Sequence, residues 1–240
     1  MRRTAQTSPA TMTSTTTEPV PLLLSWSGGK DSAFALARLL DNPAVRVVGL
    51  LTTVTSGYDR ISIHGVRRAL LERQAKCVGL PLHEIVIEPG CTNDSYEAAW
   101  LAAFSDLPAP MREARRVAFG DIFLEDVREY RERLMGRLGF DCVFPLWGEP
   151  TTQLSHAMIA AHIKARIVCV DTNVLSADFA GRPYDADLLR DLPNEIDPCG
   201  ERGEFHTFVS DGPGFEEPVD YRVGEVVLRE ERFAYCDLIP

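Results

Sequence analysis

The chain has 240 residues, with 35 acidic and 25 basic side chains, a formal net charge of −10, and 45% hydrophobic residues. This composition is typical of a globular protein with one large core, or one domain and a small appendage. No apolar run approaches the ~20 residues of a membrane helix, so we expect a soluble protein. The excess of acids argues against an extended nucleic-acid surface, which would need basic side chains to neutralise phosphates.

The six cysteines are scattered without a C-x-x-C pair, which argues against a zinc, iron–sulfur or dithiol redox centre. No secretory signal is visible, so we expect reduced thiols and a cytoplasmic location. Residues 1–19 are rich in Ser and Thr, and we interpret them as a disordered tail. An organelle transit peptide is the alternative, although no amphipathic helix is evident.

Strand-like and helix-like patterns alternate along the next part of the chain. Strands are expected at 22–26, 45–54, 82–87, 117–119, 142–146 and 167–170, and helices at 33–40, 66–78, 96–104, 123–138 and 154–163. This alternation is typical of βαβ units. It predicts an α/β fold, with a parallel sheet covered by helices on both faces, over residues 20–172.

The character of the chain changes after residue 170. Residues 171–203 are rich in Asp, Pro, Asn and Gly, with one short helix expected at 186–192. Strands are expected at 204–210, 219–228 and 232–238. We therefore predict a smaller C-terminal lobe at 173–240, packed against the α/β domain and binding the substrate.

The expected helix at 123–138 carries arginines at 128, 131 and 133 between glutamates. Alternating charges at this spacing usually form a solvated helix surface with weak ion pairs. We interpret this arginine cluster as surface rather than as a binding site.

The segment Ser27–Ser32, which reads SGGKDS, lies between the first expected strand and the first helix. Ligands bind at this edge of a parallel sheet. The two glycines allow a tight turn and a close approach to an anion, while the helix N-terminus and Lys30 favour negative charge. The spacing fits neither a Walker A loop nor a G-x-G-x-x-G fingerprint. The segment therefore predicts a phosphate-binding loop of another kind.

These letters resemble the S-G-G-x-D-S signature of the PP-loop ATP pyrophosphatases, whose fold is adenine nucleotide alpha hydrolase-like (HUP, Rossmann-like). The resemblance implies cleavage of ATP between the α and β phosphates, adenylation of a carboxylate or carbonyl oxygen, and release of pyrophosphate. It implies catalytic roles for Lys30 and Asp31, with Asp31 holding Mg²⁺; a helix cap is the alternative for Asp31. The expected nucleotide contacts are Ser25, Ser27, Gly28, Gly29, Lys30, Asp31, Ser32 and Thr52.

Five further stretches resemble the short form of the diphthine–ammonia ligase family, also called the diphthamide synthase domain. In that family the carboxylate of diphthine, a modified histidine on elongation factor 2, becomes an adenylate and ammonia displaces AMP. The resemblance implies ATP, Mg²⁺ and free ammonium, with elongation factor 2 as protein substrate. The matching stretches are His64–Val66, Phe119–Ile122, Pro145–Gly148, Cys199–Val209 and Asp211–Pro213.

The resemblance also suggests which side chains meet the second substrate. Glu204 and His206 are two apart on an expected strand and therefore face the same side. We expect them to bind substrate and act in catalysis, by positioning ammonia or accepting its proton; a polar pair at a strand edge is the alternative. Loops at the same sheet edge add expected contacts, and acidic and aromatic groups suit a quaternary ammonium. The expected substrate contacts are His64, Gly120, Asp121, Trp147, Glu201, Glu204 and His206.

Other functions stay open on the sequence. The chain could be an AMP-forming ligase for a different carboxylate or small metabolite, since a family transfers chemistry more safely than substrate. A tRNA-modifying PP-loop enzyme is disfavoured by the acidic charge and the absent C-x-x-C. A nucleotide-binding regulatory module without turnover is the remaining alternative. Neither a membrane nor a nucleic acid is expected as a partner, and a homo-oligomer is left open.

Overall fold

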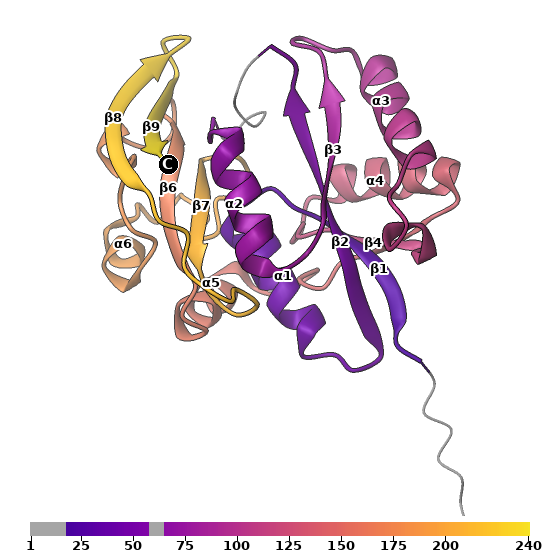
Figure 1. The fold of residues 1–240 in the computed structure, drawn as a ribbon. Helices are drawn as coiled ribbons and strands as arrows, with labels where there is room; N and C mark the ends of the chain where they lie inside the picture. The colour runs from indigo at the N-terminus through magenta and orange to yellow at the C-terminus, as the bar shows by residue number, and fades with distance from the viewer. Residues whose placement is uncertain (1–17, 58–64) are drawn as a thin grey trace, which may run out of the picture.

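The structure, a computed structural model, describes residues 18–57 and 65–240 (Figure 1). The expected tail up to residue 17 and the expected site residue His64 lie outside the described residues. Within the described residues no helix is long and apolar enough to cross a membrane.

A five-stranded parallel sheet forms the first half of the chain. Its strands lie in the order β3-β2-β1-β4-β5. Three residues in the middle of β1, Leu22, Leu23 and Leu24, are fully buried, as expected for a central strand covered on both faces. The strands are β1 (Val20–Ser25), β2 (Val45–Thr55), β3 (Leu82–Ile87), β4 (Arg116–Ala118) and β5 (Asp141–Val143).

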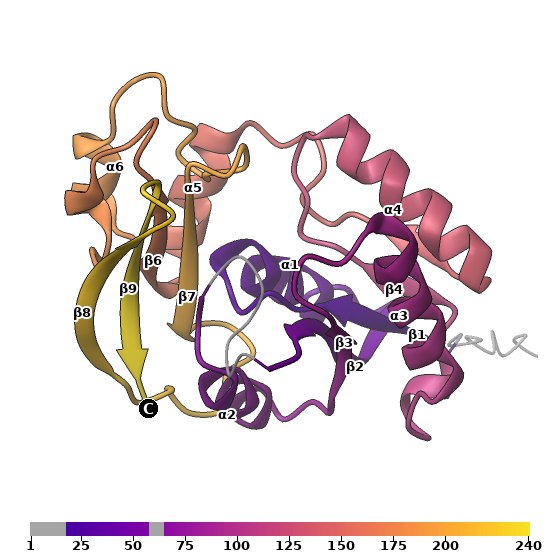
Figure 2. The same ribbon diagram turned by 90° about the horizontal axis from the view of Figure 1, so that it is seen from above.

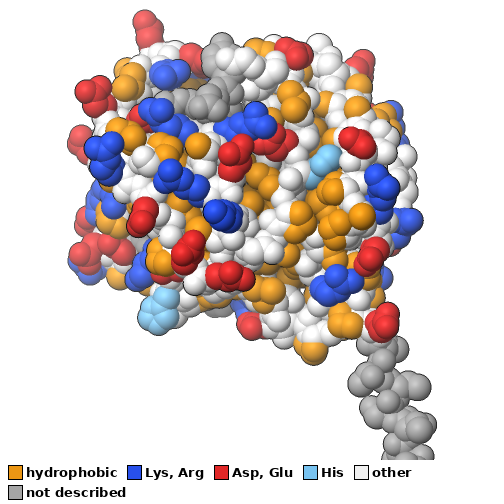
Figure 3. Space-filling view, viewed as in Figure 1, with side chains coloured by type: hydrophobic (Ala, Val, Ile, Leu, Met, Phe, Trp, Pro, Cys, Tyr) orange, Lys and Arg blue, Asp and Glu red, His pale blue; other side chains and the backbone are white. Residues whose placement is uncertain are grey.

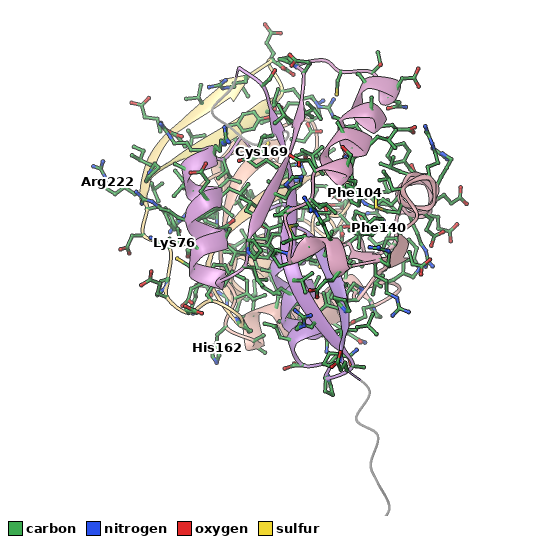
Figure 4. The ribbon with its side chains drawn as sticks, turned by 45° about the vertical axis from the view of Figure 1, so that its right-hand side comes forward. Lys76, Phe104, Phe140, His162, Cys169 and Arg222 are labelled. Carbon is green, nitrogen blue, oxygen red and sulfur yellow. The ribbon has the colours of Figure 1, made fainter. Side chains whose placement is uncertain are left out.

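Helices cover both faces of this sheet (Figure 1). The helices α1 (Lys30–Leu40) and α2 (Arg68–Val78) lie on one face, and α3 (Asn93–Ser105) and α4 (Glu125–Leu138) on the other. On the second face Phe104 and Phe140 meet edge to face, with ring centres 4.8 Å apart (Figure 4). The predicted α/β class is therefore confirmed.

The C-terminal part forms a second, antiparallel sheet in the order β7-β6-β9-β8, beside the first (Figure 2). The strand β6 was expected in the parallel sheet and belongs here instead, so the second sheet starts before residue 173. A short buried β run has the same pattern in either sheet, which explains the difference. The elements are α5 (Thr151–Ala160), β6 (Lys164–Asp171), α6 (Ala186–Asp191), β7 (Phe205–Asp211), β8 (Arg222–Arg229) and β9 (Phe233–Ile239), with 3₁₀ turns η1 (Met111–Glu113) and η2 (Ala177–Phe179).

The fully buried side chain of Gln74, on α2, joins the two sheets. Its Nε2 donates hydrogen bonds to the carbonyl oxygen of Gly28, at 2.9 Å, and to that of Val209 on β7, at 2.5 Å. Its Oε1 accepts from Nε1 of Trp26 at 3.1 Å. One amide group therefore satisfies three buried polar atoms from two lobes, and such groups are costly to leave unpaired.

We expect Gln74→Leu to lower the free energy of unfolding by about 2–4 kcal/mol, because it keeps the side-chain volume and leaves an indole N–H and a carbonyl oxygen without partners. Urea unfolding at neutral pH measures this change. Lys76→Gln, an exposed position two residues along α2, is the control and should change stability by less than about 0.5 kcal/mol. Equal stability of the two variants would contradict the assigned role of Gln74.

Candidate active site

The loop after β1 is shaped by its two glycines. Gly28 has φ of +75°, and a Cβ added there would lie 2.6 Å from Oε1 of Gln74, so glycine is required both by backbone angle and by space. Gly29 is the N-cap of α1, and its carbonyl accepts from the Ser32 hydroxyl at 2.9 Å. The Ser27 hydroxyl accepts from the N–H of Gly29 at 3.3 Å. The loop thus places serine hydroxyls around a helix N-terminus, where an anion is favoured.

Lys30 begins α1 and is only 2% exposed. Its Nζ donates to both carboxylate oxygens of Asp31, at 3.0 and 2.9 Å, and to the carbonyl of Cys199 in the C-terminal lobe. The rings of Tyr184 and Phe205 lie 5.5 and 5.4 Å from the same atom. Burial disfavours the charged ammonium, but the Asp31 carboxylate outweighs this and holds the pKa of Lys30 above its usual value.

A cavity of about 230 Å³ opens beside this loop, and both lobes line it. The loop and the adjoining strand ends form one wall, and the segment around β7 forms the other. Of the expected site residues, the structure therefore brings together nine around one space. The lining residues are Ser25, Ser27, Lys30, Asp31, Ser32, Phe119, Gly120, Asp121, Arg131, Gly200, Glu201, Gly203, Phe205, His206 and Thr207.

Backbone contacts hold the two walls together. The N–H of Lys30 donates to the Thr207 hydroxyl at 3.0 Å, and the N–H of Val209 donates to the carbonyl of Gly28 at 2.9 Å. On the other side, a Cβ on Gly120 would lie 3.0 Å from the carbonyl carbon of Asp31, so the β4 loop packs directly on the glycine loop. The glycine loop is therefore held between the loop after β4 and the strand β7.

Glu201 lies in the cavity wall contributed by the C-terminal lobe. Its Oε1 accepts from the N–H of Ile122 at 2.7 Å and, more weakly, from that of Phe123 at 3.4 Å. Burial raises the pKa of Glu201 to about 7, and the nearby carboxylates of Asp31 and Asp121 add to the rise against the Ile122 hydrogen bond. This carboxyl group therefore changes its protonation state near neutral pH.

An ion pair between Asp121 and Arg131 completes the cavity. Nε of Arg131 donates to Oδ2 of Asp121 at 2.6 Å, and the guanidinium lies 4.6 Å from the ring centre of Phe119. Arg131 belongs to the α4 arginine cluster that was expected to form a solvated surface, and this expectation is wrong for Arg131. The signal that could have found it is its position in the first half of α4, the helix that follows Asp121 at the sheet edge.

Two expected substrate residues lie away from the cavity lining. Glu204 precedes β7, is 6% exposed, and its carboxylate accepts from the N–H groups of Asp197 and Arg202 at 3.2 and 3.0 Å. Trp147 packs against the Arg128 guanidinium, 4.7 Å from its ring centre, and against Phe144. Neither residue is among those that line the cavity with His206, so their expected contacts with the second substrate stay predictions.

Thr52, an expected nucleotide contact on β2, is 3% exposed. Its hydroxyl has no hydrogen-bond partner among the described residues. A buried hydroxyl without a partner is uncommon, and a ligand is one ordinary way to satisfy it. Sequence reasoning missed Gln74, which belongs to no recognisable motif, and it gave Thr207 no role although this residue lies within the matching stretch Cys199–Val209.

Comparison with known proteins agrees with this two-lobe arrangement. The family model described as diphthamide synthase N-terminal domain matches residues 22–142, and that of the diphthamide synthase C-terminal domain matches residues 150–236.

Curated relatives carry the same family name. The diphthine–ammonia ligase of Bos taurus is 27% identical over 229 residues, which cover 84% of this chain and 82% of the bovine protein. That of Homo sapiens is 26% identical, with coverage of 84% and 83%. That of Schizosaccharomyces pombe is 26% identical over 84% of this chain, but the match covers only 36% of the yeast protein. With both domain models matched in order, the chain belongs to the diphthamide synthase family.

Proposed function

We propose that this chain, as a member of a family of ATP-dependent ligases, joins ammonia to a carboxylate and converts ATP to AMP and pyrophosphate. The observation that best supports this proposal is the cavity between the lobes. One wall holds the glycine loop and Lys30, which suit polyphosphate, and the other holds Glu201 and His206, which suit a proton-bearing nucleophile. Both reactants would meet in one partly enclosed space, as group transfer requires.

The glycine loop would hold the β and γ phosphates. The first N–H groups of α1 have no acceptor within the helix, and the helix dipole favours negative charge there. Lys30 is already fixed by the Cys199 carbonyl and two aromatic rings, so its ammonium needs little rearrangement when pyrophosphate leaves. Such fixed charges stabilise a leaving group more than mobile ones do.

Glu201 is the group that we assign to the ammonia half of the reaction. A carboxyl group with a pKa of about 7 can accept a proton from ammonium and release it again near neutral pH. His206 lines the same cavity and would help to orient the nucleophile. In this proposal Glu204 supports the loop through its two backbone hydrogen bonds.

Asp31 is the residue that would hold Mg²⁺. Magnesium usually takes one or two carboxylates together with phosphate oxygens and water, and Asp31 lines the cavity with 28% of its side chain exposed. Among the described residues no group of three or more His, Cys, Asp or Glu is placed to hold a metal by itself. When bound with ATP, the ion would neutralise charge on the phosphates.

The second substrate is proposed from the relatives, which are named for diphthine and ammonia. The carboxylate of diphthine on elongation factor 2 is therefore the first candidate, and another carboxylate is the alternative. Incubation with ATP, Mg²⁺ and ammonium, with and without elongation factor 2 carrying diphthine, distinguishes them. AMP formation that depends on the factor supports diphthine, whereas AMP formation with a small carboxylate alone supports the alternative.

We expect Lys30→Met to reduce AMP and pyrophosphate formation by at least about 100-fold, since a buried charge aimed at a leaving group contributes that much or more. Product analysis by chromatography measures the loss. Lys76→Met removes an exposed lysine from α2 and should keep nearly full activity. Full activity in Lys30→Met, or ADP as the product in the unmodified enzyme, would overturn this assignment of the loop.

The raised pKa of Glu201 predicts a pH-dependent stability difference. The folded protein holds a proton on Glu201 that the unfolded chain releases above pH 4.5, so this group's contribution to stability falls as pH rises toward 7. Glu201→Gln stays neutral and keeps an acceptor for the Ile122 N–H. Its free energy of unfolding relative to the unmodified protein should therefore rise by about 2–3 kcal/mol between pH 5 and pH 8.

Urea unfolding of both proteins at four pH values in this range gives the difference, because the titration of groups that do not interact with Glu201 cancels. Asp141→Asn, at an exposed acid, serves as the control and should show no comparable trend. A difference between Glu201→Gln and the unmodified protein that stays constant with pH would show that Glu201 is an ordinary ionised carboxylate.

A further inference from the structure

The strand β8 forms the outer edge of the C-terminal sheet. Among residues 18–57 and 65–240 it pairs only with β9, and in both ribbon views no labelled element lies beyond it (Figures 1 and 2). An open edge of this kind presents unpaired N–H and C=O groups to any other strand. Proteins usually protect such edges with proline or inward-pointing charges, and β8, which reads RVGEVVLR, has neither in its stretch Val226–Leu228.

The side chains of β8 are unusually apolar for their exposure. Val226 and Leu228 lie opposite Cys236 and Ala234 of β9, which are buried, so they continue a buried face out to the edge. They are nevertheless 49% and 56% exposed, and Val227 on the other face is 43% exposed. Figure 3 shows hydrophobic side chains among charged ones over the left-hand side, where β8 lies.

A hydrogen bond in the turn between β8 and β9 shows which backbone groups of β8 face β9 and which face the open edge. The carbonyl of Arg229 accepts from the N–H of Arg232 at 3.0 Å, so Arg229 points its backbone groups toward β9. Because these directions alternate along an antiparallel pair, the backbone groups of Val226 and Leu228 face the open edge.

We propose that β8 pairs antiparallel with β8 of a second copy of this chain, joining two four-stranded sheets into one continuous sheet. In an antiparallel pair, two residues lie opposite each other only if the backbone groups of both face the partner strand or both face away from it. When two identical strands pair about a twofold axis, one residue therefore lies on the axis, opposite its own copy. With Val227 on the axis, Val226 lies opposite Leu228 of the partner, and Glu225 lies opposite Arg229 of the partner. Symmetry repeats both pairs, giving four apolar side chains on one face and two opposite-charge pairs on the other.

Neighbouring registers lack this match. With Glu225 on the axis, the two Glu225 side chains would face each other, and with Leu228 on the axis Glu225 would face Glu231 of the partner. With Val226 on the axis, Glu225 would face Val227 of the partner and gain no charge partner. Directly opposed like charges destabilise a strand pair, so charge complementarity selects the Val227 register.

The bulge in β8 sets the length of this ladder. The register with β9 shifts between Val223 and Val226, and such a bulge bends the strand. Arg222 lies beyond the bulge, and its side chain projects outward at the side of the molecule (Figure 4). The stretch available for regular pairing is thus Val226–Arg229, with Glu225 at the end of the bulge directly before it. The strand β7, which carries His206, forms the opposite edge of the sheet, so pairing at β8 leaves the cavity accessible.

Charge reversal tests the surface and the register together. Sedimentation velocity of the full chain, from about 1 to 100 µM, should show a concentration-dependent dimer. Glu225→Arg alone and Arg229→Glu alone each place like charges in both pairs and should weaken the dimer at least tenfold. The double variant E225R/R229E restores opposite charges and should recover the original dissociation constant.

Circular dichroism of each variant shows whether it is folded, and recovery in the double variant could not arise from a folding defect. A monomer throughout the concentration range would overturn the proposal. So would a dimer that is indifferent to the single reversals, because it would use another surface. The ligase activity of the single variants is expected to be unchanged, so failure of this proposal and failure of the proposed function are independent outcomes.

Discussion

The carbonyl oxygen of Gly28 is the point on which the rest of the site depends. It accepts hydrogen bonds from the side-chain amide of Gln74 on α2 and from the backbone N–H of Val209 on β7. A carbonyl has two lone pairs, so one atom can join the parallel sheet, its covering helix and the antiparallel sheet. Gly28 also needs a positive φ and has no space for a Cβ. The same residue therefore fixes both the conformation of the loop and the position of the two lobes relative to each other. The glycine loop is thereby held in a fixed position relative to Glu201 and His206.

The charged side chains that line the cavity are also held in fixed positions. Two ion pairs, Lys30 with Asp31 and Arg131 with Asp121, line it beside Glu201. Removing two charges from water costs more than a surface pair gains, so such pairs are weak evidence for stability. They are better understood as fixed dipoles that are oriented before substrate arrives. Two positive side chains, Lys30 and Arg131, therefore line the cavity of a chain whose net charge is −10.

The sequence predicted the elements well and the packing less well. The run Leu22–Leu24 followed by SGGKDS is informative because a buried strand, a tight turn and a helix start all require particular residue types. The strand β6 was assigned to the wrong sheet, because period and hydrophobicity do not encode a strand's neighbour. Arg131 was missed for a similar reason: an arginine between glutamates on a helix looks the same whether it faces solvent or Asp121. Gln74 gave no local signal, since its three partners are distant in sequence.

The acidic motif around β7 shows how hydrogen bonding separates residues that look alike in sequence. Asp197 accepts from the N–H groups of Cys199 and Glu201, and Glu204 accepts from those of Asp197 and Arg202. Both carboxylates are buried and are used to hold the loop, in which Gly200 has no room for a side chain against Phe205. Glu201 also accepts backbone hydrogen bonds, but from the other lobe, and it alone of the three lines the cavity. For Glu201, burial and the nearby carboxylates of Asp31 and Asp121 raise the pKa. The loop therefore uses two acids for shape and leaves the third with a pKa of about 7, suited to moving a proton.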